Sequence, residues 1–355
     1  MKKLYVLAIS VFAAGLATAQ VSLSSAAANQ GNPELTSQSK VLIDKADNGG
    51  FGVAPKSKKA VTARGVNYKS FIRIGSTYYD LQSNYAMPHR LAMHSDGAIS
   101  AAWTTSTSDA VGFPGRGSGY NFRSAAGKWQ PSDSNRVENV RTGWANVGVL
   151  SNGNVFTIGH DATSGGFYMT TSSSASSRPS TLTNILKEPP YKPIWARTAN
   201  NGDVIHLICS YTDSAAPGEA RAPRRNGVFA PMVYSRSKDG GLTWDKQHVS
   251  LPGFDSTLTN NGGADQYTID VRGNTVAIVN ADLLQGVVAW KSTDGGTTFK
   301  RIIVDTFRYA PWTGKQLMTD TPFTNDGTCD VIIDKNNKDR KSTRLNSSHI
   351  TISYA

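Results

Sequence analysis

Two short runs of one pattern constrain the fold of this chain more than any other feature. Residues 237–244 read SKDGGLTW and residues 292–299 read STDGGTTF. Both fit S-x-D-G-G-x-T-aromatic, and their first serines are 292 − 237 = 55 residues apart. Each run follows an apolar, strand-like stretch. A local pattern that recurs at such a period indicates repeated supersecondary units.

The composition of the runs explains what each one does. Glycine reaches positive φ without strain, and an Asp side chain can accept hydrogen bonds from backbone N–H groups just ahead of it. The Ser hydroxyl can do the same more weakly. The aromatic residue that ends each run opens a new strand with a large ring to bury. Each run is therefore predicted to be a hairpin turn that bonds to itself and carries an aromatic anchor.

A broader repeat surrounds the two runs. Turns that end in Gly97, Gly153, Gly202 and Gly273 each separate two apolar strand-like stretches, at spacings of 153 − 97 = 56, 202 − 153 = 49 and 273 − 202 = 71 residues. Asn-Gly and Asp-Gly between apolar stretches are strong hairpin signals. Each unit adds a third strand, and a fifth unit opens at residues 329–333. No long stretch has helical periodicity, so the chain is predicted to be all-β.

The runs resemble the Asp box of the sialidase (neuraminidase, BNR-repeat) superfamily. The matching positions are Ser237, Asp239, Gly241, Thr243, Trp244, Ser292, Asp294, Gly296, Thr298 and Phe299, with Phe299 standing where Trp is usual. The resemblance implies a sialidase-like β-propeller of four-stranded blades, incomplete, with about five of an expected six blades represented. In that family the box is a structural turn remote from the active site.

The chain is expected to have four parts. Residues 1–19 fit a secretory signal peptide, with Lys2 and Lys3 before an apolar stretch and an Ala-Thr-Ala cleavage site, so we expect a secreted or cell-surface protein without a membrane span. Residues 20–60 are interpreted as a loosely ordered leader, 61–338 as the truncated propeller, and 339–355 as a non-native tail. The tail resembles a translated, adapter-derived sequencing artefact.

Within the propeller region, residues 71–74 and 77–79 are expected to form strands ahead of the repeats. A propeller often closes by letting such a segment complete its last blade. Cys209 and Cys329 fall in apolar stretches of non-neighbouring units, which favours two buried free thiols over a disulfide. Whether they are free stays open, because export would permit a disulfide.

Charge and spacing exclude several classes of partner. The formal net charge is +11, but the basic residues form no single run or helix face, so no nucleic-acid partner is expected. No Cys/His spacing suggests zinc, and no cofactor or metal is predicted. A moderate positive charge is compatible with anionic glycans and with an ordinary soluble domain.

The resemblance also implies candidate catalytic residues. The family holds a substrate carboxylate with three arginines and uses a Tyr–Glu nucleophile pair with an Asp as acid/base. Arg73, in Phe-Ile-Arg-Ile-Gly, keeps the Arg-Ile of the family's first arginine motif but lacks its Pro. Arg90, at the start of the first repeat, is the better-placed alternative. Asp109 matches the acid/base position. For all three the alternative is a solvated or ion-paired loop residue.

The implied function is a secreted exo-glycosidase that acts on terminal sialic acid or related glycans. The alternative is a non-catalytic propeller module that binds glycans or proteins at a surface. Two further groups are left open between a site and ordinary structure. One comprises Arg136, Glu138 and Arg141, before the second repeat. The other is the 213–228 insertion in the third repeat, which carries three arginines and either touches ligand or is a solvated loop.

Overall fold

The computed structural model describes residues 72–353 except 83, 162, 213–220, 283–284, 314, 317–323, 337–338 and 346–347. Contacts divide the chain into Met1–Lys69 and Ser70–Ala355. The first unit lies outside the described residues, and with it the predicted signal peptide and leader. In the part that the structure describes, no helix is long and apolar enough to cross a membrane.

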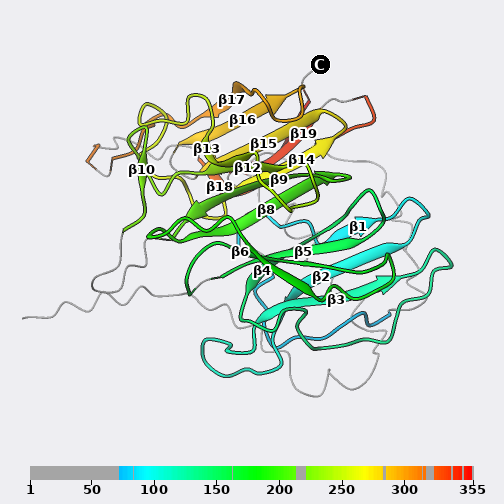
Figure 1. Cartoon of the computed structure of the whole chain (residues 1–355). Helices are drawn as coiled ribbons and strands as arrows, with labels where there is room; N and C mark the ends of the chain where they lie inside the picture. Colours follow the sequence, from blue (N-terminus) through cyan, green and yellow to red (C-terminus); the bar gives the residue numbers. More distant parts are fainter. Residues whose placement is uncertain are drawn as a thin grey trace, which may run out of the picture. The chain divides into compact units, whose positions relative to one another are not determined.

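The second unit is all-β, as predicted, and its five main sheets are antiparallel meanders in chain order (Figure 1). Blades 2, 3 and 4 have four strands each, whereas blades 1 and 5 have three. A small hairpin, β10–β11, is inserted in blade 3. The strands are β1 (Leu91–Met93), β2 (Ile99–Thr105) and β3 (Gly117–Arg123) in blade 1; β4 (Gly143–Val149), β5 (Val155–His160), β6 (Phe167–Thr171) and β7 (Thr181–Ile185) in blade 2; β8 (Pro193–Asn201), β9 (Val204–Tyr211), β10 (Arg224–Arg225), β11 (Val228–Phe229), β12 (Val233–Ser237) and β13 (Lys246–Ser250) in blade 3; β14 (Tyr267–Arg272), β15 (Thr275–Asp282), β16 (Gly286–Ser292) and β17 (Lys300–Thr306) in blade 4; and β18 (Asn325–Ile333), β19 (Asp339–Leu345) and β20 (Ser348–Ser353) in blade 5.

Each blade packs an apolar face against the next blade in the chain. Separate apolar clusters join blades 1 and 2, 2 and 3, 3 and 4, and 4 and 5. Val147 of β4, for example, is 3% exposed in the first of these clusters, and Trp290 of β16 is fully buried in the third. Successive residues of a strand point to opposite faces of its sheet. A single sheet would leave its apolar faces in water, so each blade is stabilised by packing against its neighbours.

The first strands of the blades lie around a common axis. A cavity of about 290 Å3 is lined by residues of β1, β4, β8 and β14 and by His89. Because every blade is a meander, the turns that join first to second strands lie at one end of this axis, which we call the hairpin end. The starts of the first strands and the connections between second and third strands lie at the other, the loop end.

Residues 237–244 and 292–299, which we call the paired turns, share a set of hydrogen bonds. Gly241 N and Gly296 N each donate to the serine hydroxyl of their own turn at 2.8 Å. The aspartates accept from the threonines at the seventh position, through both backbone and side chain; the four donors are Thr243 N, Thr243 Oγ1, Thr298 N and Thr298 Oγ1. Both turns also bond to the first turn of their own blade, so they lie at the hairpin end.

Both cysteines are free and buried, in agreement with the favoured prediction. Cys209 packs between blades 2 and 3, and Cys329 between blades 4 and 5. Burial raises the pKa of the Cys329 thiol to about 12. Neither thiol is a reactive group at neutral pH, because the thiolate is the nucleophilic form.

Two segments differ from expectation. Residues 72–82 form no strand, so the predicted strands there are wrong over the described residues. The segment instead lies along blade 1 through scattered bonds, such as Tyr78 N to Ser106 O and Asn121 Nδ2 to Ile74 O. Blade 5 continues through β19 and β20, within the tail that was expected to be foreign. The non-native origin of that tail stays a prediction.

Candidate functional site

In three blades a non-glycine residue with positive φ lies close to the start of the first strand, at the loop end. Trp144 has φ 55° and Trp195 φ 56°, and each sits at a register shift between the first and second strands of its blade. Asp265, two residues before β14, has φ 64°. L-residues rarely adopt this conformation, and such outliers gather at functional sites. The two bulges turn the Trp144 and Trp195 side chains out of the regular alternation of their strands.

Five side chains from four segments contact one another, and we call them the loop-end cluster: Tyr79, Phe113, Arg116, Trp144 and His160. The Arg116 guanidinium lies 5.3 Å from the Tyr79 ring centre and 5.8 Å from that of Trp144. Trp144 stacks on His160 at 5.4 Å, and Phe113 meets Tyr79 edge-on at 4.9 Å. The rings of Tyr79 and Trp144 contact each other edge-on at 6.3 Å, and the Arg116 guanidinium lies against both of them.

The electrostatics of the cluster favour an anion. Arg116 is 8% exposed, and its Nε donates to Thr142 O at 2.9 Å. Among the described residues no acidic side chain forms an ion pair with it. Burial, with a contribution from Arg141, lowers the pKa of Arg116, whereas Tyr79 raises it. A desolvated guanidinium without a carboxylate partner gains from binding an oxyanion.

His160 is neutral in this setting. Burial holds its pKa well below the usual value, and the nearby charges of Arg116, Arg197 and Arg141 lower it further. Its Nδ1 accepts the backbone N–H of Trp195 at 3.3 Å. An accepting Nδ1 places the proton of the neutral ring on Nε2, which makes that atom a hydrogen-bond donor.

A buried ion pair joins β8 to the segment before β14, next to this cluster. Arg197 and Asp265 are 1% exposed each and pair at 3.1 Å. Arg197 also donates from Nε to Ala86 O at 3.0 Å, and Ala86 N donates to Asp265 O at 3.1 Å. Burial raises the pKa of Asp265, and Arg197 opposes that shift. The segment around Ala86 is therefore fastened across blades 3 and 4, and Arg197 has a structural role.

Arg90 has a similar structural role in this structure. Its guanidinium donates to Ala145 O at 2.7 Å, to Gln82 O at 2.6 Å and to Thr104 Oγ1 at 3.3 Å. Burial, with Arg197 nearby, lowers its pKa to about 9. The role of Arg90 as a carboxylate ligand stays a prediction, and it requires a bond to a protein oxygen to be exchanged for one to substrate.

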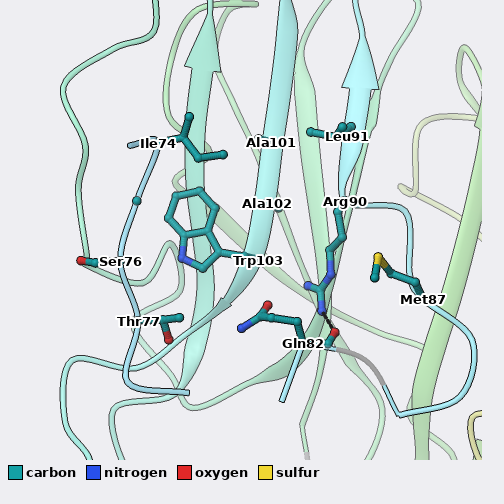
Figure 2. A pocket seen from close by; sticks show the side chains of 11 residues that line it. Ile74, Ser76, Thr77, Gln82, Met87, Arg90, Leu91, Ala101, Ala102 and Trp103 are labelled. Atoms are coloured by element: carbon teal, nitrogen blue, oxygen red, sulfur yellow. Dashed lines mark hydrogen bonds between the residues drawn. The ribbon is translucent and has the colours of Figure 1, made fainter. Parts of the chain in front are cut away.

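Arg90 also lines a cavity of about 380 Å3 on the outer face of blade 1 (Figure 2). Figure 2 shows Trp103, Leu91, Met87 and Ile74 around this space. The walls are mainly apolar and the surrounding face is uncovered: Leu91 is 65% exposed and Met87 56%. These features are those of an unpacked blade face rather than of a site with converging polar groups.

The other predicted residues are not gathered with Arg90. Arg73 is exposed in the segment before blade 1. Asp109 is exposed in the β2–β3 connection, the same loop-end connection that carries Phe113 and Arg116. In the group of Arg136, Glu138 and Arg141, Glu138 is buried and accepts a hydrogen bond from Ser118 N at 2.8 Å, while Arg141 donates to carbonyls of the β2–β3 connection. Nothing here brings Arg73, Arg90 and Asp109 into one pocket.

The residues that form the cluster were missed by sequence reasoning. Trp144 lies 153 − 144 = 9 residues before its turn glycine and Trp195 lies 202 − 195 = 7 before its own. Turns of different length between the first and second strands hide the common position of the two tryptophans. The available signal was a tryptophan followed by Ala and a polar residue at the start of each of these strands.

No family model matches the chain, and no curated protein matches it. Among solved structures, a protein of unknown function from Dyadobacter fermentans DSM 18053 is similar at 13% identity and TM-score 0.43, over 79% of this chain and 85% of that one. A Hadza microbial sialidase matches at 14% identity and TM-score 0.35, over 77% of this chain and 66% of the sialidase.

An α-L-arabinofuranosidase from Fusarium graminearum matches at 11% identity and TM-score 0.44, over 72% of this chain and 70% of the enzyme. At these identities and TM-scores the likenesses concern the fold alone. Any functional reasoning therefore rests on the residues of the loop end.

Proposed function

We propose that this protein is a secreted, sialidase-like propeller that binds a terminal acidic sugar at the loop-end cluster and hydrolyses its glycosidic bond. One observation carries the proposal: Arg116, desolvated and without a carboxylate partner among the described residues, lies against the rings of Tyr79 and Trp144. Sugar rings present C–H faces that pack on aromatic rings, and a guanidinium can bind a carboxylate through two parallel bonds.

The chemistry assigned to each residue follows from its environment. Arg116 binds the sugar carboxylate, and the Nε2–H of neutral His160 is available to a hydroxyl or ring oxygen. Asp109, in the same connection as Arg116, is proposed as the acid that protonates the leaving group. Arg73 and Arg90 are proposed as further carboxylate ligands, which requires Arg90 to exchange a bond to a protein oxygen for one to substrate and Arg73 to reach the sugar from the exposed segment before blade 1. Glycoside hydrolysis needs such a proton donor because the leaving alkoxide is a poor leaving group.

The test compares N-acetylneuraminic acid with its methyl ester by isothermal titration calorimetry. Arg116→Gln is expected to weaken binding of the acid by about tenfold or more, since one charge-assisted hydrogen bond contributes roughly 1.5–3 kcal/mol. Binding of the ester should change little. Arg272→Gln, an exposed arginine at the hairpin end, is the matched control and should leave both affinities unchanged. Equal binding of acid and ester by the unmodified protein would contradict the proposal.

A second measurement distinguishes a hydrolase from a binding module. It uses Asp109, the proposed acid, which is exposed in the β2–β3 connection that also carries Arg116. Release of fluorophore from a fluorogenic sialoside, lost in Asp109→Asn but retained in Asp96→Asn, supports the hydrolase. Binding of the acid without release supports the alternative, a non-catalytic glycan-binding propeller. Absence of both binding and release removes the assignment.

A further inference from the structure

Trp195 on β8 lies in the same kind of bulge as Trp144 on β4. Each tryptophan is the first of two residues that lie in the register shift between the first and second strands of its blade, and each has positive φ. An alanine follows in both cases, Ala145 and Ala196, and both alanines are fully buried. The two indoles therefore leave the backbone at equivalent places on adjacent blades, at the loop end.

The ring that lies behind Trp144 has no counterpart behind Trp195. In blade 2 the residue before the bulge, Gly143, pairs with His160, whose ring stacks on Trp144. In blade 3 the corresponding position across the strands is Ser210. Its hydroxyl donates to a backbone carbonyl at 2.8 Å, and a serine side chain is too small to cover an indole.

A glycine takes the place of Arg116 in blade 3. Arg116 directly precedes β3, and its backbone is hydrogen-bonded to that of the residue two before Trp144. Gly166 directly precedes β6, and its backbone is hydrogen-bonded to that of the residue two before Trp195. Residues 161–166 read DATSGG, so this connection offers no arginine or aromatic side chain to the indole.

The indole of Trp195 is consequently open. Trp195 is half-buried, whereas Trp144 is 7% exposed. Among the described residues, no aromatic ring or cationic group stacks on Trp195, no hydrogen bond reaches its Nε1, and it belongs to none of the four apolar clusters between blades. A large apolar ring that lacks a packing partner beside a candidate site is available to a ligand.

Buried groups hold the bulge of Trp195 from both sides. The Trp195 N–H donates to His160 Nδ1 at 3.3 Å, and the Trp195 carbonyl accepts the Tyr267 hydroxyl at 2.9 Å. His160 is 2% exposed and Tyr267 is fully buried. These bonds fix the peptide groups on either side of the positive φ, and one of them joins Trp195 to the loop-end cluster. A side chain on a backbone fixed in this way loses less entropy when it binds.

We propose that Trp195 is an aromatic platform for a second sugar ring, the one to which the terminal acidic sugar is linked. The platform rests on the proposed function, since the acidic sugar occupies the loop-end cluster directly beside it. The C–H face of a pyranose packs on an indole and removes apolar surface of both from water. The substrate class is therefore narrower: oligosaccharides or glycoconjugates in which a neutral pyranose carries the acidic sugar.

The test compares N-acetylneuraminic acid with 3′-sialyllactose by isothermal titration calorimetry, in the Asp109→Asn background so that no glycosidic bond is cleaved. Trp195→Ala is expected to weaken binding of the trisaccharide by about tenfold, because the stacked ring is lost. Binding of the monosaccharide should not change. Trp129→Ala is the matched control, because Trp129 is also half-buried but bridges to Arg123 at the end of β3. It should leave both affinities unchanged.

A second measurement avoids the alanine variant, in case Trp195→Ala fails to fold. Trp195→Phe keeps an aromatic face and is expected to lose no more than about threefold in affinity for 3′-sialyllactose. The chain has seven tryptophans. The trisaccharide should change their fluorescence more than the monosaccharide does, and this additional change should be lost in Trp195→Phe and kept in Trp129→Phe.

The outcomes separate the platform from the proposed function. Equal affinities for the monosaccharide and the trisaccharide, with Trp195 intact, overturn the platform and leave the proposed function standing. A Trp195→Ala variant that weakens both sugars equally also overturns the platform, since the residue would then act on the cluster through His160. Binding of neither sugar removes the proposed function, and the platform with it.

Discussion

The second glycines of the paired turns show how single residues join neighbouring blades. Gly241 faces Met169 of blade 2, and Gly296 faces Tyr234 of blade 3, so closely that a Cβ at either position would overlap the facing side chain. Both glycines also have positive φ. Local turn chemistry predicts the positive φ, but the close approach to the preceding blade depends on the packing of two sheets.

Gly296→Ala is expected to destabilise the protein more than Gly295→Ala. Both positions have positive φ, which costs an alanine about 1 kcal/mol. Gly295 has open space around its Cβ position, whereas Gly296 would overlap the Tyr234 hydroxyl, which adds about 1–3 kcal/mol. Urea unfolding of both variants measures the difference. Equal losses would show that the turn does not press on blade 3.

At the scale of elements, the side chain of Arg236 links blade 3 to blade 4 by hydrogen bonds. Arg236 on β12 is 3% exposed and binds Asp245, just before β13, through two bonds at 3.0 and 2.5 Å. It also donates to Gly295 O at 2.6 Å and to Thr297 Oγ1 at 3.0 Å, both in the paired turn of blade 4. The apolar stretch at residues 231–234 predicts a strand at the position of β12, but no local signal pairs Arg236 with a turn 59 residues later.

This link predicts a pH dependence of stability. The hydrogen bonds and charge of Arg236, aided by Lys238, lower the pKa of Asp245 to about 2, against about 3.9 in an unfolded chain. A depressed folded pKa adds stability that is fully present above about pH 4 and is lost as the pH falls toward 2. Asp245→Asn should therefore reduce the slope of the free energy of unfolding against pH between those values, measured by urea unfolding.

Lys238→Gln is the control for that experiment. Lys238 lies 3.1 Å from Asp245, but its side chain is 59% exposed, and exposed ion pairs contribute little. Its variant should keep most of the slope of the unmodified protein. A slope that vanishes equally in both variants would mean that the buried arginine is not the group that holds the carboxylate.

For the molecule as a whole, blade 1 differs from the blades that follow it. Leu91 and Val147 occupy equivalent positions in blades 1 and 2. Each lies two residues before the end of its first strand, and in both blades a connection of five residues leads to the second strand. Val147 is 3% exposed against blade 1, whereas Leu91 is 65% exposed and Met93 74%. The repeat period predicts equal positions for the two residues, but only the packing shows that no sheet of the described residues covers Leu91.

Truncation at the two equivalent positions should have unequal costs. Val147→Ala removes buried methyl groups and is expected to lower the free energy of unfolding by about 2 kcal/mol. Leu91→Ala is expected to change it by less than about 0.5 kcal/mol, since the side chain is already in water. Unfolding in urea at low protein concentration tests this. A large loss for Leu91→Ala would mean that another copy covers this face in solution.

The sequence by itself determined the all-β class, the five repeated units, the paired turns and the buried thiols. Each depends on local chemistry: period-two apolar patterns, Asn-Gly and Asp-Gly turns, and Asp and Ser side chains that bond their own backbone. Tertiary structure alone decided the loop-end cluster, because Tyr79, Arg116, Trp144 and His160 meet through strand bulges and packing between blades. A bulge shifts every later side chain relative to its neighbours, so positions that are equivalent in space are not equally spaced in the chain.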